Sequence, residues 1–213
     1  MLLKGYIKSI YNEIKVLSLL NQLTALLSHS SEANFVKKYF DSSRGKVDGH
    51  RDVRLIKSYS VYRKDHEKRF VECGYDRLNR QLLWHGTKCA NLDGILRDGF
   101  VLSFKDNLLF GNGVYFSDRV TNSCNYSDQT NYGFLLLCEV STGVIFKTEY
   151  PKQYMEAPDR YDSVQGIGKY IPEPNTSILY DDIEVPLGNT IVNKHKKTSL
   201  SELDFNEYVV FNP

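Results

Sequence analysis

The sequence predicts an α+β fold that begins with a short helical element at the N-terminus. Helical periodicity is concentrated in the first part of the chain, whereas short strand-like runs follow from residue 53 onward. Neither an internal repeat nor a low-complexity segment occurs, and 41% of the 213 residues are hydrophobic, which is enough for one domain with a proper core. Helices and strands that are segregated along the chain in this way are typical of α+β proteins.

The N-terminal segment has the pattern of an amphipathic helix. Its apolar residues recur at steps of three and four, at Ile7, Ile10, Ile14, Leu17, Leu20, Leu23 and Leu27. We expect this helix to end in the polar cluster 28–31, and Ser31 to cap a second helix with apolar side chains in 35–40. We therefore assign residues 1–45 to a helical N-terminal element and residues 46–213 to the main domain.

The pattern changes after the N-terminal element. The segment 41–52 is rich in serine, glycine and charge and is predicted to be a loop. Strand signals follow at 53–62, 81–85, 114–116, 133–140, 178–185 and 208–211. A short helix is expected at 91–99, with Gly99 as its C-cap. The run 134–138 is apolar throughout, which predicts a strand buried on both faces.

Charge and cysteine content argue against several functional classes. The 27 basic and 26 acidic residues leave a formal charge of +1, so we expect no direct DNA-binding module and no membrane association. None of the four cysteines forms a CxxC pair, so we predict no zinc site, no redox pair and no metal. The N-terminus lacks the apolar core of a signal peptide, so we expect an intracellular monomer, nuclear or cytoplasmic.

Four segments carry the residues that can do chemistry. They are Leu-Trp-His-Gly-Thr at 83–87 with Asn91 after it, Phe-Gly-Asn-Gly-Val-Tyr-Phe-Ser-Asp at 110–118, Ser-Cys-Asn-Tyr at 123–126, and Asn-Glu-Tyr-Val-Val at 206–210. Each of them alone has a structural explanation, because glycines make turns with positive φ and tyrosines fill cores. The second segment fits neither the GxGxxG nor the Walker pattern of nucleotide-binding loops.

Taken together and in this order, the four segments resemble the catalytic domain of the poly(ADP-ribose) polymerase family, from about residue 53 to the C-terminus. The segments 162–169 and 185–188 resemble the subgroup nearest the DNA-damage-responsive members. The resemblance implies the ADP-ribosyltransferase fold, with mixed and antiparallel split β-sheets and flanking helices. It implies that NAD is the substrate, that nicotinamide leaves, and that ADP-ribose passes to an acceptor protein, either as one unit or with elongation.

The resemblance also implies a catalytic triad of His85, Tyr115 and Glu207. Cleavage of NAD develops oxocarbenium-like charge on the ribose, and a carboxylate beside that ribose stabilises it. By resemblance, Glu207 has this role and His85 hydrogen-bonds the adenosine ribose. Tyr115 lines the pocket for the nicotinamide ring.

The other binding residues follow from the same resemblance. Gly86 would offer its backbone N–H and C=O to the nicotinamide carboxamide, and Ser123 would add a hydroxyl. Tyr126 would stack on the ring from the face opposite Tyr115, because aromatic faces suit a flat cation. Asn91 would line the adenosine side.

Several positions depart from the family pattern. Asn122 stands where close polymerase relatives have a lysine, Val101 replaces an arginine near the adenosine pocket, and the loop 101–109 is shorter. These departures bear on polymer length, acceptor binding and NAD affinity. Residues 12–29 resemble the last long helix of the relatives' regulatory domain, and we expect that helix to pack on the catalytic domain rather than to gate it.

Three other functions remain open at this point. The chain could transfer single ADP-ribose units or hydrolyse NAD, or it could bind NAD or ADP-ribose without catalysis. An RNA 2′-phosphotransferase of related fold would need basic residues clustered around the site, and the sequence shows no such cluster.

Overall fold

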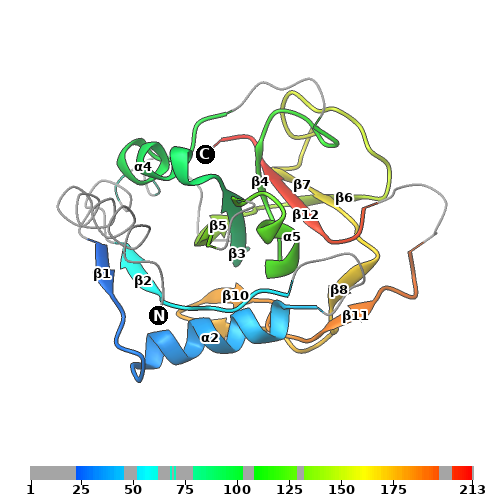
Figure 1. The fold of residues 1–213 in the computed structure, drawn as a ribbon. Coiled ribbons are helices and arrows are strands. Elements are labelled where there is room, and N and C mark those ends of the chain that lie inside the picture. Colours follow the sequence, from blue (N-terminus) through cyan, green and yellow to red (C-terminus); the bar gives the residue numbers. More distant parts are fainter. Residues whose placement is uncertain are drawn as a thin grey trace.

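Two four-stranded sheets form the framework of the protein, and three helices among the described residues flank them (Figure 1). The structure is a computed structural model, and it describes residues 23–45, 52–61, 68, 70, 79–102, 108–128, 132–196 and 203–212. The predicted α+β class is confirmed, and none of the described helices is long and apolar enough to cross a membrane.

The first sheet has the order β5 (Phe134–Ser141), β3 (Arg80–Thr87), β10 (Ile183–Val185) and β9 (Ile178–Tyr180). The second has the order β4 (Val114–Phe116), β12 (Glu207–Val210), β7 (Ser163–Gly166) and β6 (Ile145–Thr148). Two small sheets pair β1 (Leu23–Ala25) with β2 (Tyr59–Val61) and β8 (Tyr170–Pro172) with β11 (Thr190–Val192). The helices are α2 (Ser31–Ser43), α4 (Cys89–Asp98) and α5 (Val120–Cys124).

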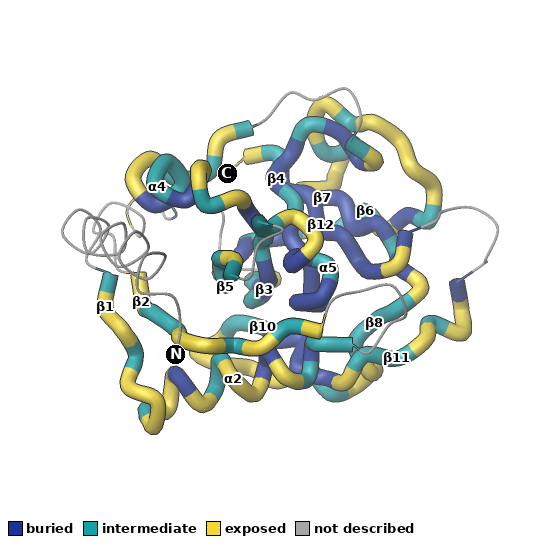
Figure 2. The backbone as a smooth tube through the Cα atoms, viewed as in Figure 1, coloured by how far each residue is buried: buried dark blue, intermediate teal, exposed yellow. Residues whose placement is uncertain are grey.

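The two main sheets meet where β3 passes the end of β4. Trp84 and Ser117 exchange two backbone hydrogen bonds of 2.8 Å there. Successive side chains of a strand point to opposite faces, so Leu83 and Trp84 enter two different core clusters, and both are buried. In Figure 2, β7 and β12 are buried along their whole length, which makes them the most protected part of the second sheet.

Helix α2 starts and ends at different residues from those predicted. Its N-cap is Ser30, whose hydroxyl oxygen accepts a hydrogen bond of 3.1 Å from the Ala33 N–H, so the predicted cap at Ser31 is one residue late. The helix continues to Ser43, beyond the predicted start of the loop at residue 41. Its buried Tyr39 packs against the indole of Trp84, with ring centroids 5.2 Å apart, and this contact joins α2 to β3.

The predicted N-terminal helix is wrong at its C-terminal end. Its residues 1–22 lie outside the described part of the chain, but Leu23–Ala25 form β1, which pairs antiparallel with β2. The apolar Leu23 packs against Leu92 and Leu96 of α4, and it does so from a strand and not from the apolar stripe of a helix. The division at residue 45 stays a prediction.

The other predicted elements are largely confirmed. Helix α4 ends at Gly99, which has φ 92° and donates its N–H to the Ile95 carbonyl, as the predicted C-cap requires. The predicted strand 53–62 is reduced to β2, and the predicted strand 178–185 is a hairpin that turns at Asp181 and Asp182, with φ 50° and 63°. The run 134–138 is not buried on both faces. It lies in β5 at the edge of its sheet, and each of its residues is partly exposed.

Candidate active site

The end of β3 presents backbone groups on the edge opposite β5, where no strand in the described part of the chain pairs with them. Backbone groups of residues two apart in a strand point to the same edge. Trp84 uses that edge to pair with Ser117, and Leu82 uses it to accept a hydrogen bond of 3.0 Å from the Tyr39 hydroxyl. Gly86 therefore directs its N–H and C=O past Ser117, where no strand among the described residues pairs with it. A donor and an acceptor side by side match the two hydrogen-bonding groups of a carboxamide.

Gly86 also touches α5 through the backbone of Ser123. A Cβ at Gly86 would lie 1.8 Å from the Ser123 carbonyl oxygen, so any side chain there would displace the helix. The Ser123 hydroxyl is buried and donates to the Trp84 carbonyl at 3.1 Å. Its oxygen keeps lone pairs with which it can accept an amide N–H. The glycine is therefore required by packing as well as by access for a ligand.

His85 is held as a neutral imidazole. Burial lowers its pKa, and its Nδ1 lies 2.8 Å from the Tyr115 carbonyl oxygen. A carbonyl only accepts, so Nδ1 carries the proton and Nε2 is left as a hydrogen-bond acceptor. Phe100 and Phe116 pack around the ring, with centroids at 4.8 and 5.6 Å from that of His85. The site thus offers Nε2 to a hydroxyl donor.

The Tyr115 hydroxyl fixes the loop that precedes β4. It donates to the Gly111 carbonyl at 2.9 Å and accepts the Phe110 N–H at 3.0 Å. Gly111 has φ 93°, as a glycine turn requires, and a Cβ there would meet the Tyr154 carbonyl at 1.7 Å. Burial raises the pKa of Tyr115, so the hydroxyl stays protonated and works as an anchor for the ring.

Glu207 begins β12 and is 4% exposed. Its Oε1 accepts hydrogen bonds from the Tyr126 hydroxyl at 3.0 Å and from the Asn122 side-chain amide at 3.5 Å. Burial raises the pKa of Glu207, and these two hydrogen bonds oppose that rise. Both donors within the described residues converge on Oε1, which leaves Oε2 for a substrate hydroxyl.

Tyr126 combines a held hydroxyl with an accessible ring. The residue is 56% exposed, although its hydroxyl reaches the buried Glu207. Burial of the hydroxyl and the charge of Glu207 raise the pKa of Tyr126, so it remains a hydrogen-bond donor. An exposed aromatic face beside a carboxylate suits the stacking of a flat cationic ring.

Asn91 is the predicted site residue with the least direct link to His85, Tyr115 and Glu207. It is exposed on α4, and its side-chain amide lies 3.5 Å from the Thr87 hydroxyl at the end of β3. Its side chain makes this contact at the end of β3, and that contact places Asn91 next to the site. Val101 is 77% exposed just beyond α4, while 103–107 of the short loop lie outside the described residues.

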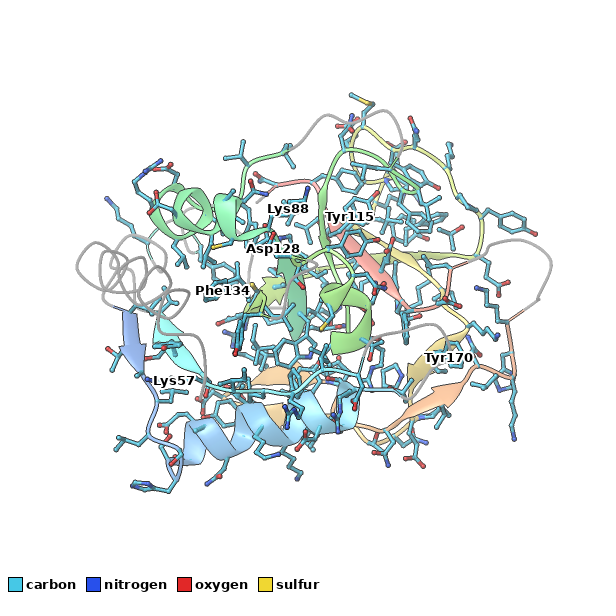
Figure 3. All side chains as sticks on the ribbon, in the orientation of Figure 1. Lys57, Lys88, Tyr115, Asp128, Phe134 and Tyr170 are labelled. Atoms are coloured by element: carbon cyan, nitrogen blue, oxygen red, sulfur yellow. The ribbon has the colours of Figure 1, made fainter. Side chains whose placement is uncertain are left out.

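Two features were not predicted from the sequence. Asp128 caps α4 from a distance, because its Oδ2 accepts the Cys89 N–H at 2.7 Å, and Figure 3 shows Asp128 beside Lys88, the N-cap residue of α4. Asp118 is completely buried and accepts hydrogen bonds from the two neighbours of Glu207. The only sequence feature that indicated Asp118 was its position in the segment 110–118. No group of three or more His, Cys, Asp or Glu in the described chain is arranged to hold a metal.

The chain is similar to known proteins over most of its length. The family model described as poly(ADP-ribose) polymerase catalytic domain matches residues 30–213. Poly(ADP-ribose) polymerase of Drosophila melanogaster is 32% identical over 200 residues, which cover 90% of this chain and 20% of that protein. Poly(ADP-ribose) polymerase 1 of Gallus gallus is 32% identical over 191 residues, 86% of this chain and 18% of that protein.

Poly(ADP-ribose) polymerase 2 of Arabidopsis thaliana is also 32% identical, over 199 residues that cover 89% of this chain and 31% of that protein. The chain thus spans about a fifth of the length of the animal relatives and about a third of the plant relative. The family match covers most of the chain, and the relatives named polymerase 1 and 2 agree with the subgroup expected from 162–169 and 185–188. The chain therefore belongs to the poly(ADP-ribose) polymerase catalytic domain family and has the ADP-ribosyltransferase fold.

Proposed function

We propose that this protein is an NAD-dependent ADP-ribosyltransferase. It cleaves the bond between nicotinamide and ribose and passes ADP-ribose to an acceptor. The observation that carries the proposal is the buried carboxylate of Glu207, which is held through one oxygen by Tyr126 and Asn122. The backbone groups of Gly86 and the histidine acceptor complete a site with complementary groups for the separate parts of NAD.

Substrate binding in this proposal uses residues of β3, β4 and α5 together with Tyr126, which follows α5. The carboxamide hydrogen-bonds the N–H and C=O of Gly86, and its amide N–H can reach the Ser123 oxygen. The ring lies between Tyr115 and Tyr126, whose faces suit its positive charge. His85 Nε2 accepts a hydroxyl of the adenosine ribose, and its neutral state is maintained by burial.

The chemical step breaks the C1′–N bond, and its electron pair moves into the ring. Nicotinamide leaves as a neutral molecule, so the leaving group needs no strong acid. Positive charge grows on the ribose, and the Glu207 carboxylate stabilises it and accepts a hydrogen bond from the 2′-hydroxyl. An acceptor nucleophile then attacks C1′, and its proton passes to Glu207 or to solvent.

We propose a protein acceptor and a product of single units or short oligomers. The side chain that contacts Glu207 from α5 is the neutral amide of Asn122, whose Nδ2 lies 3.5 Å from Oε1. It cannot attract the pyrophosphate of an incoming ADP-ribose chain as a lysine would. Asn122→Lys should lengthen the product on a denaturing gel, and Asn125→Lys, at an exposed position of the same turn, is the matched control.

The proposal is tested with NAD labelled in the adenylate part. Nicotinamide release and label transfer to protein are followed in the same reaction. Release together with discrete labelled bands supports transfer of short products, whereas a long smear would contradict the proposed product length. Release without transfer would identify a glycohydrolase, and NAD binding without release would identify a binding module.

A further inference from the structure

A completely buried carboxylate lies behind the strand that carries Glu207. Asp118 follows β4, and its Oδ2 accepts hydrogen bonds from the Asn206 side-chain amide at 2.7 Å and the Tyr208 hydroxyl at 3.1 Å. Asn206 and Tyr208 are the two chain neighbours of Glu207. In an extended chain their side chains leave on the face opposite that of Glu207. One carboxylate oxygen therefore holds both residues that flank the catalytic position.

Further contacts fix the same two neighbours. The Ser117 hydroxyl donates to the Asn206 carbonyl at 2.8 Å, and the Gly168 N–H donates to the Asn206 side-chain oxygen at 2.9 Å. The Gln165 amide donates to the Tyr208 hydroxyl at 2.9 Å. The side chains that make these contacts, Ser117, Gln165, Asn206 and Tyr208, are all buried, which makes alternative positions of the strand costly.

Asp118 is itself held by a cation that is independent of the active site. The Arg119 Nε lies 3.4 Å from Asp118 Oδ1, and both side chains are fully buried. The guanidinium also donates to the Gly188 carbonyl at 2.6 Å and to the Pro186 carbonyl. Arg119 thus ties the Asp118 carboxylate to the segment 186–188, and this link does not involve Glu207 or its donors in the α5 region.

We propose that Asp118 is a positioning residue for Glu207, acting through Asn206 and Tyr208. The inference rests on the proposed function, because it assigns how the carboxylate of that site is placed. The hydrogen bonds from Tyr126 and Asn122 orient the end of the Glu207 side chain, whereas the Asp118 cluster fixes the backbone from which it starts. A misplacement of about 1 Å at a reacting centre costs on the order of 10²-fold in rate, so the backbone position matters for catalysis.

The test uses Tyr208→Phe, Asn206→Ala and the double variant in the full chain. We expect kcat for nicotinamide release to fall about tenfold in Tyr208→Phe and further in the double variant. The KM for NAD and the Kd for benzamide should stay close to those of the wild type, because Gly86, Ser123 and the tyrosines are untouched. Ser163→Ala is the control, since it removes a buried hydroxyl with a bond of 2.6 Å to Thr142 at the far end of the same sheet.

Two kinetic results would overturn the inference. The first is a wild-type kcat in the double variant, and the second is an equal loss of kcat in Ser163→Ala. A crystal structure of Tyr208→Phe provides a readout that needs no activity, because we expect the contact of 3.0 Å between Tyr126 and Glu207 to lengthen. If the wild type released no nicotinamide, the proposed function would fail. A displaced Glu207 would still support the positioning role, and an unmoved Glu207 would refute it.

Discussion

Two buried carboxylates lie on opposite sides of β12, and their surroundings differ. Asp118 is fully buried, ion-paired with Arg119 and hydrogen-bonded by Asn206 and Tyr208. Glu207 is almost as buried, but its donors are one tyrosine hydroxyl and one amide at 3.5 Å, and both come from the region of α5. Burial raises the pKa of both groups, and only Asp118 has a cation that opposes this rise.

The difference indicates that Asp118 stabilises the fold and the position of β12, whereas Glu207 takes part in the proposed chemistry. A paired buried charge is compensated locally, and its removal leaves its partner unpaired. A buried carboxylate without a cation is less stable in its ionised form, and it gains most when positive charge develops beside it. We therefore expect substitutions of Asp118 to reduce stability as well as the rate, and substitutions of Glu207 to reduce the rate alone.

The largest expected effect is that of Asp118→Asn on stability. The substitution leaves the Arg119 guanidinium buried without its counter-ion, and breaking such a pair costs about 3–5 kcal/mol. Denaturant unfolding measures this loss. Asp93→Asn, which breaks the exposed pair with Arg97, is the control and should change stability far less, because solvent screens an exposed ion pair. Equal stability of the two variants would contradict the stabilising role of the buried pair between Asp118 and Arg119.

Glu207→Gln should show the reverse pattern. The amide keeps the shape but removes the charge that faces the ribose, so kcat for NAD cleavage should fall by about 10²–10³. NAD binding should change much less, because the interaction is made mainly in the transition state. The folded state disfavours the ionised carboxylate, so the melting temperature at neutral pH should stay equal or rise. Near-normal transfer by this variant would show that Glu207 is not the catalytic carboxylate.

The pH dependence of Tyr126→Phe tests how Glu207 is kept ionised without a cation. The Tyr126 hydroxyl is a hydrogen-bond donor that lowers the pKa of Glu207, so its removal should raise that pKa further. The ionised carboxylate is the active form, so activity is lost as the pH falls through this pKa. The acid limb of the kcat–pH profile should therefore move to higher pH in the variant. A limb that stays in place, or moves to lower pH, would contradict the role of this hydrogen bond.

The smallest expected effect concerns the ring of Tyr126. Benzamide has the flat ring and carboxamide of nicotinamide and should compete with NAD. Tyr126→Ala removes one stacking face and should weaken benzamide binding by about 0.5–1.5 kcal/mol. Tyr126→Phe retains the ring and is the matched control for calorimetric titration. Binding that is indifferent to both Tyr126→Ala and Ser123→Ala would refute this model of the nicotinamide pocket.

The features predicted well from the sequence are those encoded over a few residues. The C-cap at Gly99 follows from the conformational freedom of glycine, and β4 and β12 follow from short apolar runs. The order of the four chemical segments, and with it the family, was likewise available from the sequence, as the match over 30–213 confirms. The predicted roles of the site residues remain predictions.

The features that failed depend on partners that are distant in the chain. Leu23 fits a helical stripe by its spacing, but its pairing with Val61 places it in a strand. The run 134–138 has the composition of a central strand and lies at the edge of its sheet, because nothing in a single strand specifies its neighbours.

The sequence by itself determined the family, the α+β class and the residue types at the predicted site, because these depend on local order and composition. Only the tertiary structure decided that Gly86 must be a glycine because the Ser123 carbonyl lies against it. It also brought Asn206 and Tyr208 to Asp118, across 88 and 90 residues of chain. Hydrogen bonds over such separations form only when the two sheets assemble, so they cannot be predicted from the local periodicity of the sequence.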